Sequence, residues 1–161
     1  MSDNETIDPQ AFRSALGAYA TGVTVITTRD RDGNNVGMTA SSFTSLSLDP
    51  PLILWSIDKR TGCFDVFNEA EHFAIHVLKD SQEELSNHFA GRGFDKFKDI
   101  ASTEGVGGAP ILADYSACFQ CSTEHRYEGG DHIIIVGRVL SFEEHPSKPL
   151  IFCQGKYAHI A

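Results

Sequence analysis

Three short segments gather the side chains that are most able to bind a ligand. The densest hydroxyl cluster spans residues 37–45, Gly-Met-Thr-Ala-Ser-Ser-Phe-Thr-Ser. It lies between apolar segments, where hydroxyls need hydrogen-bond partners. Its small residues would let a flat heterocycle with several carbonyls, or a phosphate, approach the backbone closely. Composition alone favours a plainer alternative, a solvent-facing strand rich in Thr and Ser.

The second segment is residues 56–61, Ser-Ile-Asp-Lys-Arg-Thr, which follows a predicted buried strand and opens a predicted helix. A helix N-terminus combined with Lys59, Arg60 and hydroxyls makes an anion site. A solvated turn with Thr61 as a helix cap explains the same residues equally well.

The third segment is residues 127–132, Tyr-Glu-Gly-Gly-Asp-His. Because His132 begins a predicted strand beside a glycine-rich turn, it could present an imidazole at the mouth of a cleft. The alternative is a turn histidine that is hydrogen-bonded locally.

The bulk composition limits the partners of the chain. With 161 residues, 41% of them hydrophobic, the sequence predicts one globular domain over 1–161, with residues 1–8 as a flexible tail. A net charge of −9 argues against binding nucleic acid or an anionic membrane surface. Any nucleotide site must therefore be locally positive, as residues 56–61 are. The polar, acidic N-terminus and the lack of a long apolar stretch lead us to expect a cytoplasmic protein.

The sequence lacks the motifs of several common enzyme classes. The sequence has no G-x-G-x-x-G after a strand, no phosphate-binding P-loop and no G-x-S-x-G elbow. Cys118 and Cys121 form a C-x-x-C within a predicted strand, where positions three apart face opposite sides. They are expected to be buried thiols. His72 and His76 share one strand face, but without a third ligand they predict packing and no metal site.

Hydrophobic periodicity and turn signals predict the elements that must position these segments. An amphipathic helix follows Asp8-Pro9, with apolar residues at 12, 15, 16 and 19. Further helices are expected at 61–70 and from Asp80 or Ser81 to Phe89, and a long loop at 91–110. Strands are expected at 23–28, 36–44, 52–57, 72–78, 115–126, 132–142, 150–152 and 157–160. About seven strands with two or three short helices predict an antiparallel, barrel-like α+β protein.

Together these residues resemble the flavin reductase-like family, which has a split β-barrel flavin-binding fold. The resemblance covers nearly the whole chain. It rests on residues 20–25 (Ala-Thr-Gly-Val-Thr-Val), 37–51 (from Gly-Met-Thr to Asp-Pro-Pro), 129–133 (Gly-Gly-Asp-His-Ile), 136–139 (Val-Gly-Arg-Val), 149–150 and 155–157. It implies an α+β, antiparallel split β-barrel with a few short peripheral helices.

The resemblance also implies an activity and a set of site residues. Many members use NADH or NADPH to reduce FMN or FAD, act as homodimers, and supply the reduced flavin to a transient monooxygenase partner. Carried over to this chain, the flavin ring and ribityl chain would contact Met38, Thr39, Ala40, Ser41 and Ser42. The phosphate end would contact Ser56, Lys59, Arg60 and Thr61, and aromatic contacts would come from Phe89 and Tyr157. His132 would lie on the nicotinamide side and orient that ring.

Two other functions remain open at this point. The fold also suits a flavoprotein that holds FMN for electron transfer and has no free-flavin reductase activity. A ligand-binding barrel without a redox role is the second alternative, and it predicts no FMN binding.

Overall fold

The computed structural model describes residues 6–93 and 95–161. Its main sheet has seven strands in the order β3 (Asn35–Ala40), β2 (Thr24–Arg29), β6 (His72–Val77), β9 (Ala117–Gly129), β10 (His132–Glu144), β5 (Pro51–Asp58) and β4 (Thr44–Leu48). A second sheet joins β1 (Thr21–Gly22), β11 (Leu150–Cys153) and β12 (Lys156–His159), and a third pairs β7 (Ser102–Glu104) with β8 (Pro110–Leu112). The helices are α1 (Pro9–Gly17), α2 (Phe64–Glu69) and α3 (Glu83–Ala90), with 3-10 turns η1 (Asp80–Gln82) and η2 (Val106–Gly108).

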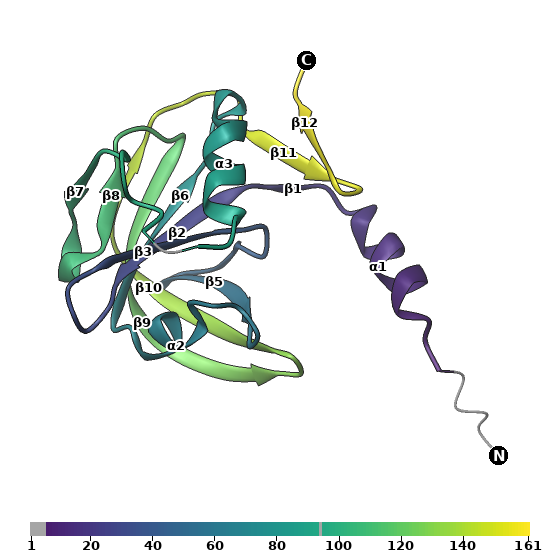
Figure 1. The fold of residues 1–161 in the computed structure, drawn as a ribbon, viewed down its shortest axis with the longest axis horizontal. Coiled ribbons are helices and arrows are strands. Elements are labelled where there is room, and N and C mark those ends of the chain that lie inside the picture. The colour runs from purple at the N-terminus through teal and green to yellow at the C-terminus, as the bar shows by residue number, and fades with distance from the viewer. Residues whose placement is uncertain (1–5, 94) are drawn as a thin grey trace.

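The main sheet is antiparallel throughout and curls on itself (Figure 1). Its two edge strands, β3 and β4, are consecutive in the chain and are joined by residues 41–43 alone. Such a connection spans about 14 Å at most, so the two edges must lie near one another. The strands do not pair there, which leaves the barrel open at the hydroxyl cluster. The predicted antiparallel split barrel is confirmed.

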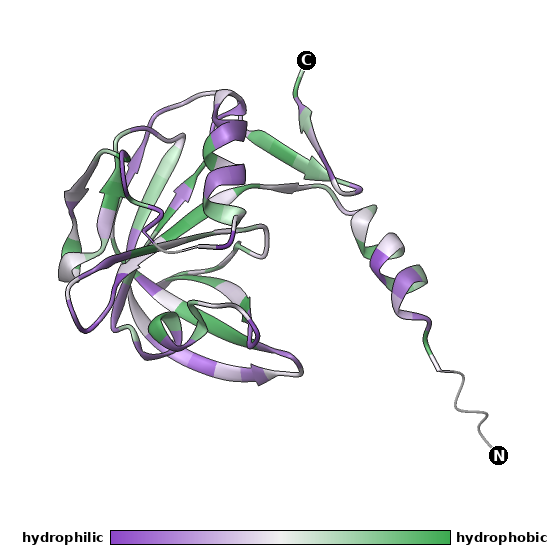
Figure 2. Ribbon diagram, viewed as in Figure 1, coloured by the Kyte–Doolittle hydropathy of each residue, from purple (hydrophilic) through white to green (hydrophobic). Residues whose placement is uncertain are grey.

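One face of β5 packs into the core. Ile53, Trp55 and Ile57 are buried, whereas the alternate residues, including Ser56 and Asp58, are half-buried on the other face. The strand at 52–57, which was predicted to be buried, is thus fully buried on one face only. The Trp55 ring packs edge-to-face on two phenylalanines, one of them from α2. Hydrophobic residues run along the strands, and many loops are hydrophilic (Figure 2).

A second core cluster fixes α3 against β3. Phe89 of α3 is fully buried with Val25, Leu78 and Leu150. A Cβ atom on Gly37 would lie 2.7 Å from the Phe89 ring, so only glycine permits this close approach. The helix therefore supports the strand that carries the hydroxyl cluster.

Some predicted boundaries were wrong. The extended segment 36–44 ends at Ala40, and a separate strand, β4, follows it. The predicted loop 91–110 contains β7, η2 and the start of β8. The predicted helix 61–70 begins only at Phe64. The missed strands are short, and β7 has the sequence Ser-Thr-Glu, which carries no apolar alternation.

The predicted N-terminal helix is present as α1, but none of its residues is buried in the core. The Asp8 side chain caps it by accepting a hydrogen bond from the Gln10 backbone N–H at 3.0 Å. Its apolar residues Phe12 and Leu16 are exposed, and the helix projects away from the sheet (Figure 1). Residues 1–5 of the predicted tail lie outside the described residues. In the part of the chain that the structure describes, no helix is long and apolar enough to cross a membrane.

The two cysteines of the C-x-x-C motif point into different core clusters, as their spacing predicted. Cys118 packs with Tyr115 and Cys121 packs with the main core. Burial raises the pKa of each thiol to about 12. Across residues 6–93 and 95–161, no group of three potential metal ligands is found.

His76 is a buried structural histidine. Its Nδ1 lies 3.0 Å from the Val25 carbonyl oxygen, and its Nε2 accepts a hydrogen bond from the Leu112 backbone N–H at 3.1 Å. Because Nε2 is an acceptor, the proton resides on Nδ1 and the ring is neutral. Burial lowers the pKa of His76 to about 4.

Neutral burial of His76 predicts acid-sensitive stability. Its pKa is about 6.5 in the unfolded chain and about 4 in the folded protein. The contribution to stability is therefore complete above pH 6.5 and is lost as the pH falls toward 4, by roughly 3 kcal/mol. Urea unfolding at pH 7, 6, 5 and 4.5 measures this loss. His76→Gln, which does not titrate, should be less stable at pH 7 but should show a shallower decline. Equal pH slopes in both proteins would contradict the assignment.

Candidate functional site

The hydroxyl of Ser42 bridges the opening of the barrel. It donates to the Ser56 carbonyl oxygen at 2.9 Å and accepts from the Ser56 backbone N–H at 3.0 Å. The pairing of β4 with β5 ends at Leu54, so the β5 edge at Ser56 has no strand partner there. Ser42 therefore satisfies both backbone groups that a neighbouring strand would otherwise bond. This structural role of the Ser42 hydroxyl was not predicted from the sequence.

A second set of hydroxyls ties the hydroxyl cluster to α3 and β12. Thr39 Oγ1 donates to the Ser86 carbonyl oxygen at 2.6 Å, and the Ser86 hydroxyl lies 2.7 Å from the Tyr157 hydroxyl. Tyr157 also donates to Asn87 Oδ1 at 2.9 Å. Thr39 and Tyr157, both predicted near the cofactor, are thus linked through one helix.

The remaining residues of this predicted surface differ in exposure. Met38 is half-buried against the main core, Ala40 is buried and Ser41 is exposed. Phe89 has no exposed surface and packs on Phe97, with ring centroids 5.2 Å apart. The Phe89 side chain thus supports β3 from the core, and its contact with a cofactor stays a prediction.

The predicted positive patch is neutralised by nearby carboxylates. Lys59 Nζ lies 2.6 Å from Glu128 Oε2, and Arg60 binds Asp58 through two side-chain hydrogen bonds of 3.1 and 2.8 Å. Hydrogen bonds from Arg60 hold the pKa of the Asp58 carboxyl well below its usual range. Thr61 lies in the turn before α2 and does not cap it, so the alternative of a Thr61 helix cap is wrong, and the anion site at residues 56–61 stays a prediction.

The β9–β10 hairpin brings the third segment beside the second. His132 lies opposite Asp58 in the register of β10 and β5, and the Lys59 backbone N–H donates to the Asp131 carbonyl oxygen at 2.9 Å. His132 Nδ1 lies 2.7 Å from Asp131 Oδ1, and 39% of the His132 side chain is exposed. The local hydrogen bond expected of a turn histidine is present, and the imidazole still faces solvent.

Residues from all three segments thus meet at the opening of the barrel. Ser42 contacts Ser56 from the first and second segments, and Lys59 contacts Asp131 from the second and third. The residues that sequence reasoning missed are the carboxylates that pair with the cations. The Asp58-x-Arg60 spacing could have revealed one pair, but Glu128 contacts Lys59 only through the fold.

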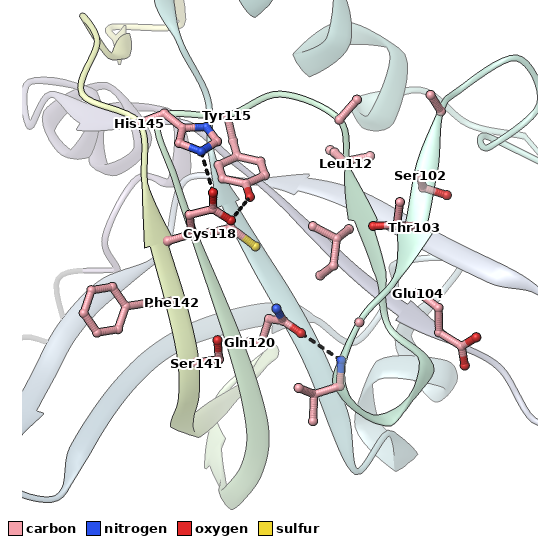
Figure 3. Close-up of a pocket in the computed structure, with 16 residues that line it drawn as sticks. Ser102, Thr103, Glu104, Leu112, Tyr115, Cys118, Gln120, Ser141, Phe142 and His145 are labelled. Carbon is pink, nitrogen blue, oxygen red and sulfur yellow. Dashed lines mark hydrogen bonds and ion pairs between the residues drawn. The ribbon is translucent and has the colours of Figure 1, made fainter.

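A hollow of about 850 Å³ lies elsewhere, between the β7–β8 hairpin and β9 and β10 (Figure 3). Its wall includes Tyr115, which donates to Glu143 at 2.9 Å, and His145, whose Nε2 lies 2.7 Å from the same carboxylate. None of the predicted site residues lines this hollow. We therefore base the candidate site on the residues that could bind a ligand, and not on the position of this hollow.

The double hydrogen bond of Ser42 predicts a stability difference between adjacent serines. Ser42→Ala leaves the Ser56 N–H and carbonyl without their partner and should destabilise the fold by about 1–3 kcal/mol. Ser41→Ala removes an exposed hydroxyl and should change stability by less than about 0.5 kcal/mol. Urea unfolding at pH 7 measures both. Equal stability of the two variants would refute the bridging role.

Comparison with known proteins identifies the family of the chain. Residues 16–161 match the flavin reductase like domain. The chain is 44% identical to a probable flavin reductase of Rhizobium meliloti over 95% of its own length, but it spans only 49% of that protein. It is 44% identical to an FMN reductase (NADH) of Agrobacterium fabrum, covering 94% of this chain and 86% of the relative.

A solved structure is similar over almost the whole of both chains. It is the NADH:FAD oxidoreductase of Streptomyces globisporus in complex with NAD and FAD fragments, with a TM-score of 0.89 and 35% identity, covering 98% of this chain and 97% of that one. Other relatives are named reductase subunits of flavin-dependent monooxygenases. With the domain match spanning most of its length, this chain belongs to the flavin reductase-like family.

Proposed function

We propose that the chain transfers a hydride from NADH or NADPH to FMN or FAD, and that the reduced flavin then serves a partner monooxygenase. The observation that carries the proposal is the meeting of three sequence-distant segments at the opening of the barrel, through the Ser42–Ser56 and Lys59–Asp131 contacts. Relatives named FMN reductase (NADH) and monooxygenase reductase subunit support the same activity.

The residues present suit a flavin and a second nucleotide. The flavin supplies the hydride acceptor when it is bound. The segment from Met38 to Ser42 would contact its ring and ribityl chain, and Ser56, Lys59, Arg60 and Thr61 its phosphate end. The ion pairs of Lys59 and Arg60 are exposed, and such pairs contribute little net stability, so a phosphate can compete with the carboxylates.

His132 would position the nicotinamide against the flavin. Its Nδ1 is held by Asp131, which fixes the ring and leaves Nε2 available to a ligand. Hydride transfer needs the two rings to be stacked and aligned, and it needs little proton transfer from the protein. A positioning role therefore accounts for His132 without a catalytic base.

The chain would act as a homodimer. The exposed apolar residues of α1 and the adjoining segment, Phe12, Leu16 and Tyr19, support this proposal, because a second subunit would remove them from water.

The proposed activity predicts flavin-dependent oxidation of the reduced nicotinamide. The purified chain, assayed with NADH and NADPH and with FMN, FAD and riboflavin in turn, should oxidise at least one nucleotide only when free flavin is added. The combination with the highest kcat/KM identifies the preferred pair. A yellow protein that retains FMN and does not respond to added flavin would instead indicate an electron-transfer flavoprotein.

Two histidine variants separate positioning from general damage in the same assay. His132→Ala should lower the rate of hydride transfer or raise the KM for NADH roughly ten-fold, because ring alignment is lost. His125→Ala changes an exposed histidine of the same hairpin and should leave both constants unaltered. An unaltered rate and KM in His132→Ala would rule out the positioning role.

A further inference from the structure

A lysine outside the predicted site has the strongest physical reason to bind an anion. Lys59 and Arg60 are each paired with a carboxylate, so a ligand phosphate must compete with Glu128 and Asp58. Lys96 differs. Among the residues that the structure describes, its ammonium has no carboxylate within 4 Å, and it donates to the Phe89 carbonyl oxygen at 2.8 Å.

The segment that carries Lys96 is held against α3 and β3. A ring nitrogen of His88, Nε2, lies 2.6 Å from the Lys96 carbonyl oxygen, and the Phe97 ring packs edge-to-face on Phe89. A Cβ atom on Gly37 would approach both phenylalanine rings, to 2.7 Å for Phe89 and 3.2 Å for Phe97. The segment that carries Lys96 is therefore held beside Gly37, the first residue of the hydroxyl cluster.

Lys96 also lies within electrostatic reach of Cys63, which comes two residues after Thr61. Burial raises the pKa of the Cys63 thiol, and the charge of Lys96 partly offsets that rise. Burial in turn lowers the pKa of Lys96 itself. A half-buried ammonium with one carbonyl partner and no counter-ion is incompletely solvated, and phosphate oxygens would complete its hydrogen bonds.

We infer that Lys96 binds the phosphate of the flavin and thereby makes the chain prefer phosphorylated flavin to riboflavin. The inference rests on the proposed function, because it takes the hydroxyl cluster and the turn at 59–63 as the flavin site. The ligand group is a phosphate ester, which a nicotinamide dinucleotide also carries. The test therefore measures the two nucleotides separately.

Flavin binding, measured by quenching of flavin fluorescence without NADH, tests the inference in the intact chain. The wild-type chain should bind FMN more tightly than riboflavin. Lys96→Met keeps the side-chain length and removes the charge, and it should lower the preference for FMN roughly ten-fold or more, as expected for a charge-assisted hydrogen bond. Lys96→Arg should restore most of the preference. Lys98→Met, an exposed lysine of the same segment, should leave it unaltered.

Three results would overturn the inference. They are an equal affinity of the wild-type chain for FMN and riboflavin, an equal loss of both in Lys96→Met, and a Lys96→Met effect confined to the KM for NADH. Thermal melting of each variant confirms that it is folded. A chain that shows Lys96-dependent FMN binding but oxidises no NADH on addition of flavin would refute the proposed activity while the role of Lys96 stands.

Discussion

The connection between the two edges of the main sheet constrains everything at the candidate site. Residues 41–43 join β3 to β4, so seven strands must curl until their edges lie close together. The β5 edge would then expose the N–H and carbonyl of Ser56, and the Ser42 hydroxyl satisfies both. A polar residue in this connection therefore stabilises the fold, and it places a hydroxyl at the opening of the barrel.

The charges at the opening follow from the same geometry. Antiparallel register sets His132 opposite Asp58, and the hairpin turn brings Glu128 against Lys59. In a chain with a net charge of −9, the cations that approach this opening are held by internal carboxylates when no ligand is bound. A ligand phosphate must displace them, whereas Lys96 has no carboxylate to displace within the described residues. The cations near the opening therefore differ: Lys59 and Arg60 are paired with carboxylates, and Lys96 is not paired with one in the part of the chain that the structure describes.

The sequence predicted features whose signals are local. Alternation of apolar residues and the Gly-Gly-Asp turn indicated the β9–β10 hairpin, and the spacing of Cys118 and Cys121 indicated opposite faces. The three candidate segments were also visible in the chain, as clusters of hydroxyl, cationic and glycine residues. Their meeting point depends on register and curl, which arise from long-range contacts.

Other features could not be predicted because tertiary contacts decide them. Phe89 has the same aromatic chemistry in a core as beside a cofactor, and its burial depends on packing against Gly37 and the second core cluster. The partner of Lys59 is a glutamate far along the chain. Lys96 lies in a predicted loop and gained significance only once α3 and β3 were placed.

The central claim is that three separate segments form one flavin site at the opening of the barrel. Hydrogen–deuterium exchange of the chain with and without FMN tests it most directly, because bound ligand slows the exchange of amides that it covers. We predict joint protection of residues 37–43, 56–63 and 127–132 on addition of FMN. Protection confined to the hollow around Tyr115, Glu143 and His145 would contradict this location of the site.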